Sequence, residues 1–108
     1  MESFTQVIKA LSDDNRLSIL GMLLRHDLCV GALSKHIGVS EAAVSQHLKV
    51  LREAGLVTGE KRGYYTHYAV NRDLLRDTAE ELLRMADQRR EEMKCKKGDG
   101  HSCCQVDA

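Results

Sequence analysis

Apolar and polar residues follow a helical period between Val30 and Gly55, in two short segments separated by a turn. Each segment places three apolar residues on one face: Val30, Leu33 and Ile37 in the first, and Val44, Leu48 and Leu51 in the second. Such a face predicts an amphipathic helix that packs on a core. Two such helices joined at Gly38 are typical of a DNA-reading helix-turn-helix, and an ordinary helical hairpin in an all-α core is the alternative.

The second predicted helix has suitable residues at both ends. Ser40 fits the N-cap, where its hydroxyl accepts a backbone hydrogen bond, and Glu41 complements the positive end of the helix dipole. Gly55 fits the position after the helix, where a positive φ is common. Small and polar side chains on the outer face would let the helix lie close to DNA and hydrogen-bond to base edges. The predicted DNA-binding residues of this segment are Ser40, Ala42, Ala43, Ser45, Gln46, His47 and Lys49.

Two more helices are predicted ahead of this motif. The first has one apolar face and ends near Ser12; the face consists of Phe4, Val7, Ile8 and Leu11. Ser12 is predicted to cap the second helix, with Asp13 and Asp14 in its first turn, where carboxylates are favourable against the helix dipole. The second helix continues to about Arg25 and is predicted to bury Leu17, Leu20, Leu23 and Leu24.

Residues 57–70 are rich in strand formers, namely Val57, Thr58, Tyr64, Tyr65, Thr66, Tyr68 and Val70. The central Lys61-Arg62-Gly63 predicts a β-hairpin, because Gly63 readily adopts a positive φ in the turn. Lys61 and Arg62 are predicted at the tip, where they would meet phosphates or a minor groove of DNA. A solvated loop is the alternative interpretation of the tip.

Residues 71–93 are predicted to form a last helix with a broad apolar stripe: Leu74, Leu75, Thr78, Ala79, Leu82, Leu83, Ala86 and Met93. A helix of this length spans about 33 Å, more than a small core covers, so part of the stripe is predicted to contact a second copy. The predicted fold class is α+β and mostly helical: a winged helix-turn-helix with a two-stranded hairpin wing, dimerising through terminal helices. Residues 1–93 would form this domain, and residues 94–108 a cysteine-rich tail.

Composition and charge agree with a small DNA-binding domain. The chain has 108 residues, which is one domain with a small core for its surface. Net charge is zero, but residues 34–72 carry six Lys/Arg against three Glu, net +3, and residues 73–93 carry four Arg against seven Asp/Glu, net −3. The basic segment is the one predicted to contact DNA. The N-terminus does not resemble a secretory signal, so a cytoplasmic location is expected.

Three stretches of the chain resemble the ArsR/SmtB family of metal-sensing transcriptional repressors, in order and at that family's spacing. They are ALSDDNRLSILGMLL, DLCVGALSKHIGVSEAAVSQHLKVLREAGLV and KRGYYTHYAV, and the match covers roughly residues 4–93. The resemblance implies a homodimer that binds a palindromic double-stranded operator and represses a detoxification operon until an inducer lowers its affinity for DNA. No enzymatic activity is expected, because no Cys, His and acidic residue occur together in a recognisable nucleophilic context. No membrane contact is expected either, because no run approaches 18 consecutive apolar residues.

The inducer site has to be inferred from this chain's own thiols. Arsenite sensors of the family can carry a Cys-x-Cys with a further Cys at the start of the helix before the recognition helix. Here only Cys29 matches, because Gly31 and Ser34 occupy the other two positions. Zinc, cobalt and nickel sensors of the family use Asp and His on the last helix, and residues 72–93 contain no histidine.

The other three thiols are Cys95 and the adjacent pair Cys103 and Cys104 in the tail. Thiolates prefer soft ions, which favours As(III), Sb(III) or a trivalent organoarsenical such as methylarsenite, with no organic cofactor. Neighbouring lysines at 94, 96 and 97 favour the thiolate of Cys95. Arsenite would use three sulfurs and a monosubstituted organoarsenical two, so the adjacent pair alone would suffice for the latter.

Alternatives remain open for each thiol. Cys29 is also consistent with a small buried hydrophobe, and the tail with a disordered end bearing free thiols. Structural zinc held by Cys95, His101, Cys103 and Cys104 would instead indicate a zinc-stabilised protein-interaction module. A repressor released by thiol oxidation or persulfidation is a further alternative.

Overall fold

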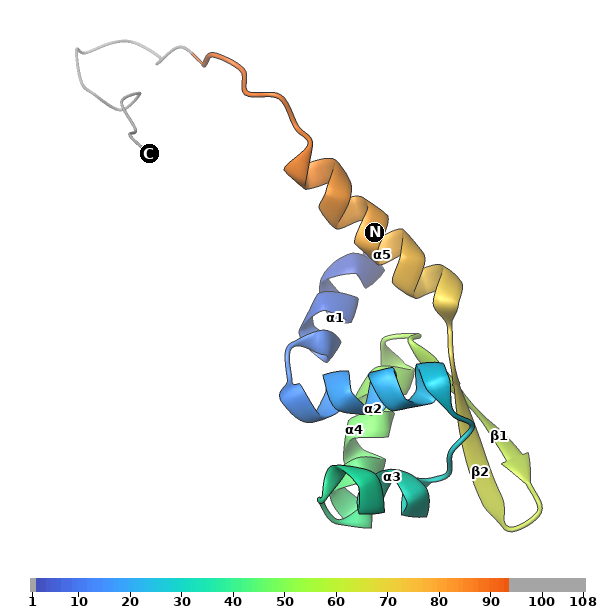
Figure 1. Cartoon of the computed structure of the whole chain (residues 1–108). Coiled ribbons are helices and arrows are strands. Elements are labelled where there is room, and N and C mark those ends of the chain that lie inside the picture. Colours follow the sequence, from blue (N-terminus) through green and yellow to red (C-terminus); the bar gives the residue numbers. More distant parts are fainter. Residues whose placement is uncertain (1, 94–108) are drawn as a thin grey trace.

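A computed structural model of the protein describes residues 2–93, with side chains from residue 4, so the predicted tail thiols lie outside it. In chain order the described part consists of α1 (Glu2–Leu11), α2 (Asp14–Arg25), α3 (Val30–Ile37), α4 (Glu41–Glu53), β1 (Val57–Arg62), β2 (Tyr65–Val70) and α5 (Arg72–Ala86). Helices α2, α3 and α4 pack together, and the antiparallel hairpin β1–β2 extends from them as a wing (Figure 1). The predicted winged helix-turn-helix is confirmed.

The core lies where α1, α2, α3 and α4 meet. The predicted inward residues Leu33, Val44, Leu48 and Leu51 are all at most 1% exposed. The predicted face of α2 is partly wrong, because Leu17 is 50% exposed and Ile19 is buried in its place. Ile19, Leu20 and Leu23 share one helical face, whereas Leu17 lies about 160° around the helix from Ile19.

The predicted cap of α2 is also displaced by one residue. The N-cap is Asp13, whose carboxylate accepts a hydrogen bond from the backbone N–H of Arg16 at 3.1 Å. Ser12 instead donates its hydroxyl to the backbone carbonyl of Lys9 at 2.7 Å, which satisfies a carbonyl at the end of α1. A serine beside an aspartate leaves two adjacent cap candidates, and the tight α1–α2 connection selects Asp13.

Both predicted ends of α4 are confirmed. The Ser40 hydroxyl accepts from the backbone N–H of Ala43 at 3.0 Å. At the other end Gly55 has φ +83°, its N–H donates to the carbonyl of Arg52, and the N–H of Leu56 donates to the carbonyl of Leu51, both at 2.9 Å. This pair of bonds is a Schellman motif, which turns the chain from α4 directly into β1.

The wing differs from the prediction at its tip. The last residue pair is Arg62 opposite Tyr65, so the two-residue turn consists of Gly63, with φ +65°, and Tyr64. Arg62 is therefore a strand residue, and Tyr64, predicted in a strand, lies in the turn. Ahead of α3, Cys29 forms an antiparallel bridge with His67, which places the α2–α3 connection along the outer edge of β2.

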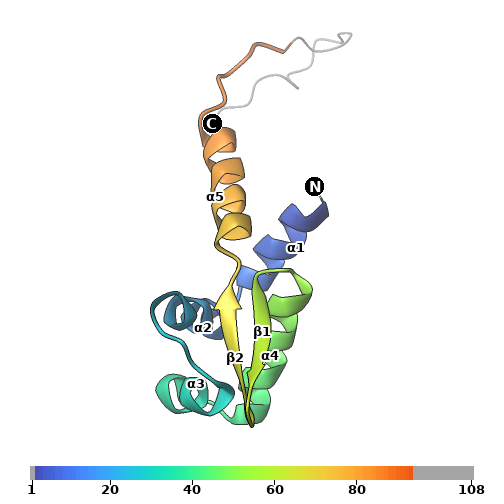
Figure 2. The same cartoon turned by 90° about the vertical axis from the view of Figure 1, so that its right-hand side faces the viewer.

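Helix α5 is shorter than predicted, because it ends at Ala86 and Met93 lies beyond it. Residues 87–92 contain no apolar side chain, and acidic groups near a helix C-terminus are unfavourable against its dipole. Helices α1 and α5 lie at the end of the molecule opposite the wing tip (Figures 1 and 2). Within residues 2–93, no helix has the length and apolar character needed to cross a membrane.

We expect Gly55→Ala to destabilise the fold by about 1–2 kcal/mol, because alanine is strained at φ +83° and its Cβ would lie 3.3 Å from Leu74. Gly21→Ala is the matched control. Gly21 lies inside α2 with open space where the methyl group of an alanine would lie, so we expect stabilisation by about 0.5–1 kcal/mol. Urea unfolding at one protein concentration measures both, and equal stability of Gly55→Ala and the parent chain would contradict the left-handed turn.

Candidate nucleic-acid interface

The N-terminus of α4 and the tip of the wing lie at the same end of the molecule (Figure 2). On α4 the outer face carries the side chains that the sequence singles out: Ser40, Ala42, Ser45, Gln46 and Lys49 are exposed, and Ala43 is half-buried. The opposite face is committed to the core by Val44, Leu48 and Leu51. The helix therefore presents short polar groups and small side chains to solvent, which suits close approach to the edges of bases.

His47 belongs to α4 but not to its exposed face. Its side chain is 18% exposed, with Nδ1 3.4 Å from the Arg16 guanidinium and 3.9 Å from the Asp13 carboxylate. The backbone N–H of Arg16 lowers the pKa of Asp13, so this carboxylate stays charged. Arg16 also donates to the backbone carbonyl of Ala10 at 2.6 Å. The structure thus places His47 where α4 joins α2 and the end of α1, a position that sequence spacing on α4 alone does not reveal.

The wing tip presents the cation of Lys61 and two exposed tyrosine rings. Lys61 is exposed and has no ion-pair partner in the described part of the chain. Tyr64 is 97% exposed in the turn, and Tyr65 follows at 63%. The sequence does not predict Tyr64 as a DNA-binding residue, because its strand propensity points to pairing. The sequence signal that could have placed Tyr64 in the turn is its position directly after Gly63.

Arg62 lies next to Lys61 but is engaged by acidic side chains. Its guanidinium donates to the Asp27 carboxylate at 2.5 Å and to the Glu60 carboxylate at 2.9 Å. The Asp27 carboxylate also lies 3.0 Å from Nδ1 of His67. Hydrogen bonds from Arg62 and then His67 lower the pKa of Asp27 below its ordinary value of 3.8, and Glu60 and then Asp27 raise the pKa of Arg62. Arg62 and the Asp27 carboxylate therefore remain charged on the side of the wing at neutral pH.

Cys29 lies at the N-cap of α3, partly exposed and with no capping hydrogen bond from its side chain. It borders a hollow of about 270 Å³ between the start of α3 and the wing, lined by Cys29, Val30, Gly31, Glu41, Tyr64, Tyr65, Thr66 and Tyr68. Among residues 2–93, no three His, Cys, Asp or Glu side chains are grouped to hold a metal ion. The other predicted ligands, Cys95, Cys103 and Cys104, lie beyond the part that the structure describes.

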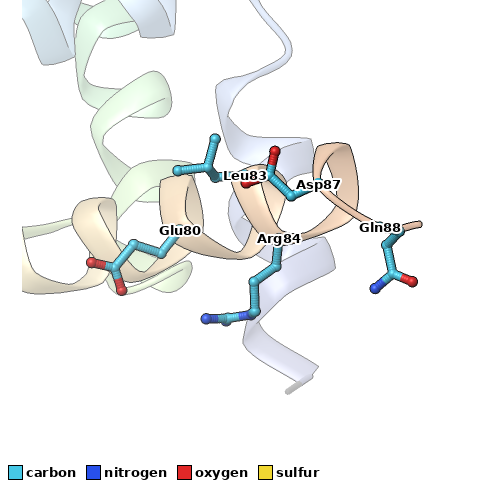
Figure 3. A pocket seen from close by; sticks show the side chains of 5 residues that line it. All are labelled: Glu80, Leu83, Arg84, Asp87 and Gln88. Atoms are coloured by element: carbon cyan, nitrogen blue, oxygen red, sulfur yellow. The ribbon is translucent and has the colours of Figure 1, made fainter.

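The last turns of α5 expose large apolar side chains, with Leu82, Leu83 and Met85 between 46% and 60% exposed. Leu83 and Arg84 point to opposite sides of the helix (Figure 3). A hollow of about 420 Å³ here is lined by α5, its C-cap and one following residue: Glu80, Leu83, Arg84, Asp87 and Gln88. A hollow with walls from one helix and its C-cap does not enclose a small ligand.

Comparisons with known proteins agree with this geometry. Residues 13–58 match the family described as bacterial regulatory protein, arsR family. The chain is 35% identical over 107 residues to the arsenical resistance operon repressor of Bacillus subtilis strain 168, covering 95% of this chain and 92% of that protein. It is 38% identical over 79 residues to the transcriptional activator HlyU of Vibrio cholerae, covering 73% of each.

Two solved structures show the same architecture. HlyU from Vibrio cholerae has a TM-score of 0.66 at 36% identity, covering 81% of this chain and 95% of that one. The homodimeric winged helix-turn-helix DNA-binding domain from Mycobacterium bovis has a TM-score of 0.67 at 26% identity, covering 80% and 81%. The chain therefore belongs to the ArsR family of bacterial transcriptional regulators, a class that binds operator DNA and is not enzymatic.

Proposed function

We propose that this protein is a repressor that binds its operator through α4 and the wing, and releases it when a trivalent arsenical binds cysteine thiolates. The DNA-binding part of this proposal is supported by the location of α4 and the wing tip at the same end of the molecule. The start of α4, with its exposed polar residues, and the tip of the wing, which follows Lys61 in the chain, lie at one end of the described part of the chain, and α1 and α5 lie at the other (Figure 2). A regulator of this kind works in the cytoplasm, where the DNA is.

The proposed active form is a homodimer on a palindromic operator. Leu82, Leu83 and Met85 leave an apolar strip on α5 that nothing in the described part of the chain covers. The related Mycobacterium bovis domain is homodimeric, which supports an equivalent pairing here. A two-fold dimer joined at α1 and α5 would present two copies of α4 to successive major grooves, about 34–36 Å apart.

The proposed inducer is As(III), Sb(III) or a trivalent organoarsenical. Two observations support it: the clustering of Cys95, Cys103 and Cys104 within ten residues, and the similarity to an arsenical resistance operon repressor. Cys29 is the remaining candidate ligand. Because its described surroundings supply no three-ligand group, Cys29 would need thiols from the tail or from a second chain to complete a site.

For DNA recognition we expect Gln46→Ala to relax base preference and to cost roughly 1–3 kcal/mol of binding free energy, because Gln46 is exposed on the reading face of α4. Lys61→Ala should weaken binding to all sequences alike and reduce the salt slope by about one, as loss of one phosphate contact does. Anisotropy titrations on a duplex selected from a random library, at several salt concentrations, measure both effects. Unaltered sequence preference in Gln46→Ala would remove it from the interface.

For assembly we expect Leu82→Glu to dissociate or unfold the dimer, because it buries a carboxylate in the proposed contact at a cost of several kcal/mol. Lys35→Gln makes the same change in net charge at an exposed position on α3, away from α1 and α5, and should leave the dimer intact. Sedimentation equilibrium distinguishes the species. A stable Leu82→Glu dimer would show that the copies pair elsewhere.

For the inducer we expect Cys103→Ser and Cys104→Ser to bind operator normally but to resist release by trivalent arsenicals, because a hydroxyl does not replace a soft thiolate. Cys95→Ser should abolish the response to arsenite, a three-sulfur ligand, and keep the response to methylarsenite. Operator release with each compound in parallel is the measurement. A normal response in both tail variants, with loss in Cys29→Ser, would move the site to the start of α3.

The same titration separates arsenical sensing from the remaining possibilities. Release by peroxide or a persulfide donor, with no response to arsenicals, would identify the thiols as a redox sensor. Zinc in the purified protein, together with operator binding that a chelator abolishes, would identify a structural zinc site instead.

A further inference from the structure

We propose that Arg62 positions the wing and does not contact DNA, and that Asp27 is its essential partner. The sequence predicts Arg62 as a DNA contact beside Lys61, and nothing in the sequence separates the two cations. The geometry does separate them, because Arg62 is bound to two carboxylates and Lys61 to none in the described residues. This inference rests on the proposed binding of DNA by the wing.

The wing needs such a support because only its inner part packs on the core, through Val57 of β1 and Tyr68 and Val70 of β2. In β1 only Val57, at the base of the hairpin, is buried, and every residue from Thr58 to Arg62 is exposed. A two-stranded hairpin is marginally stable by itself in water. Apolar packing therefore holds the base of the wing, and the direction of its outer half depends on polar contacts.

The polar contacts converge on the connection between α2 and α3. Asp27 receives Arg62 from the end of β1 at 2.5 Å and faces His67 on β2 at 3.0 Å, so one carboxylate is tied to both strands. The Cys29–His67 backbone bridge lies two residues further along the same connection. We call the side chains of Asp27, Arg62 and His67 the wing clamp. It joins the outer half of the wing to the helical body.

A phosphate contact by Arg62 would compete with this clamp. Rotating the guanidinium to DNA would leave the carboxylates of Asp27 and Glu60 without their cation and close to a phosphate, where like charges repel. Lys61 carries no such cost. Because successive side chains of a strand point to opposite faces, Lys61 and Arg62 also face different directions. Lys61 and the exposed Tyr64 and Tyr65 are thus side chains at the wing tip that remain for DNA.

A double-mutant cycle on the full chain tests the clamp, with operator affinity measured on the duplex selected by the parent protein. We expect Arg62→Gln and Asp27→Asn each to weaken binding by about 2- to 5-fold, a modest loss in keeping with exposed ion pairs. The double variant should be no weaker than either single variant, because both remove one interaction. Asp27→Asn is decisive: it adds positive net charge and yet is expected to bind DNA less tightly.

A direct phosphate contact predicts the opposite pattern. Arg62→Gln would then reduce the salt slope by about one, as Lys61→Ala does, while Asp27→Asn would free the guanidinium and leave binding unchanged or tighter. That result, or additive effects of the two substitutions, would overturn the clamp. The matched control is Glu60→Gln, which removes the other carboxylate on Arg62 but keeps Asp27, and we expect less than about a 2-fold change in affinity.

Amide hydrogen exchange without DNA gives a second, independent measurement. Loss of the clamp should speed exchange in the outer half of the hairpin in both Asp27→Asn and Arg62→Gln, with α4 unchanged. Unchanged wing exchange would contradict the clamp even if the parent chain bound no operator. Failure of the parent chain to bind any selected duplex would instead refute the proposed function, so the two failures are distinguishable.

Discussion

The structure depends above all on burial of one face of α4. Val44, Leu48 and Leu51 are removed from water against the other helices, and the Schellman turn at Gly55 continues that buried line into Leu56 and Val57. Burying a side chain of this size contributes about 1.5–3 kcal/mol. Because the inward face is held this firmly, the outward face of α4 is presented to solvent in one orientation, which is what reading base edges requires.

Polar contacts then hold together elements whose relative positions apolar packing does not determine. The Arg16 guanidinium joins the end of α1 to His47 on α4, so the reading helix is linked to an element at the far end of the molecule. The wing clamp does the same for the hairpin, whose outer half has little apolar support. The wing clamp uses Arg62, a cation of the basic segment 34–72 that the sequence alone assigns to DNA.

Within the described part of the chain, large apolar side chains are exposed to solvent at the end of α5. Thr78 is buried, whereas Leu82, Leu83 and Met85 further along the helix are exposed. The C-terminal half of α5 extends away from the other helices (Figure 1). An apolar strip in this position is consistent with a helix that completes its packing on a second copy, and it lies far from the surface proposed to meet DNA.

The sequence by itself determined the order of the elements, the inward face of α4 and both of its caps. These features depend on helical period, on capping side chains and on the preference of Gly55 for positive φ, all of which act between neighbours in the chain. The structure adds that Asp13 caps α2 while the Ser12 hydroxyl bonds back to the Lys9 carbonyl, and that Ile19 rather than Leu17 is buried in the core. The end of α5 at Ala86 depended on the absence of apolar residues directly beyond it.

Only the tertiary structure decided the roles of individual charged residues. Arg62 and Lys61 are adjacent cations of the same hairpin, and they differ because Asp27, thirty-five positions away from Arg62, lies within hydrogen-bond distance of one of them. His47 shares a helix with Gln46, yet it faces Arg16 on α2. Partners so distant in sequence leave no periodic signal, because the fold and not the local chain brings them together.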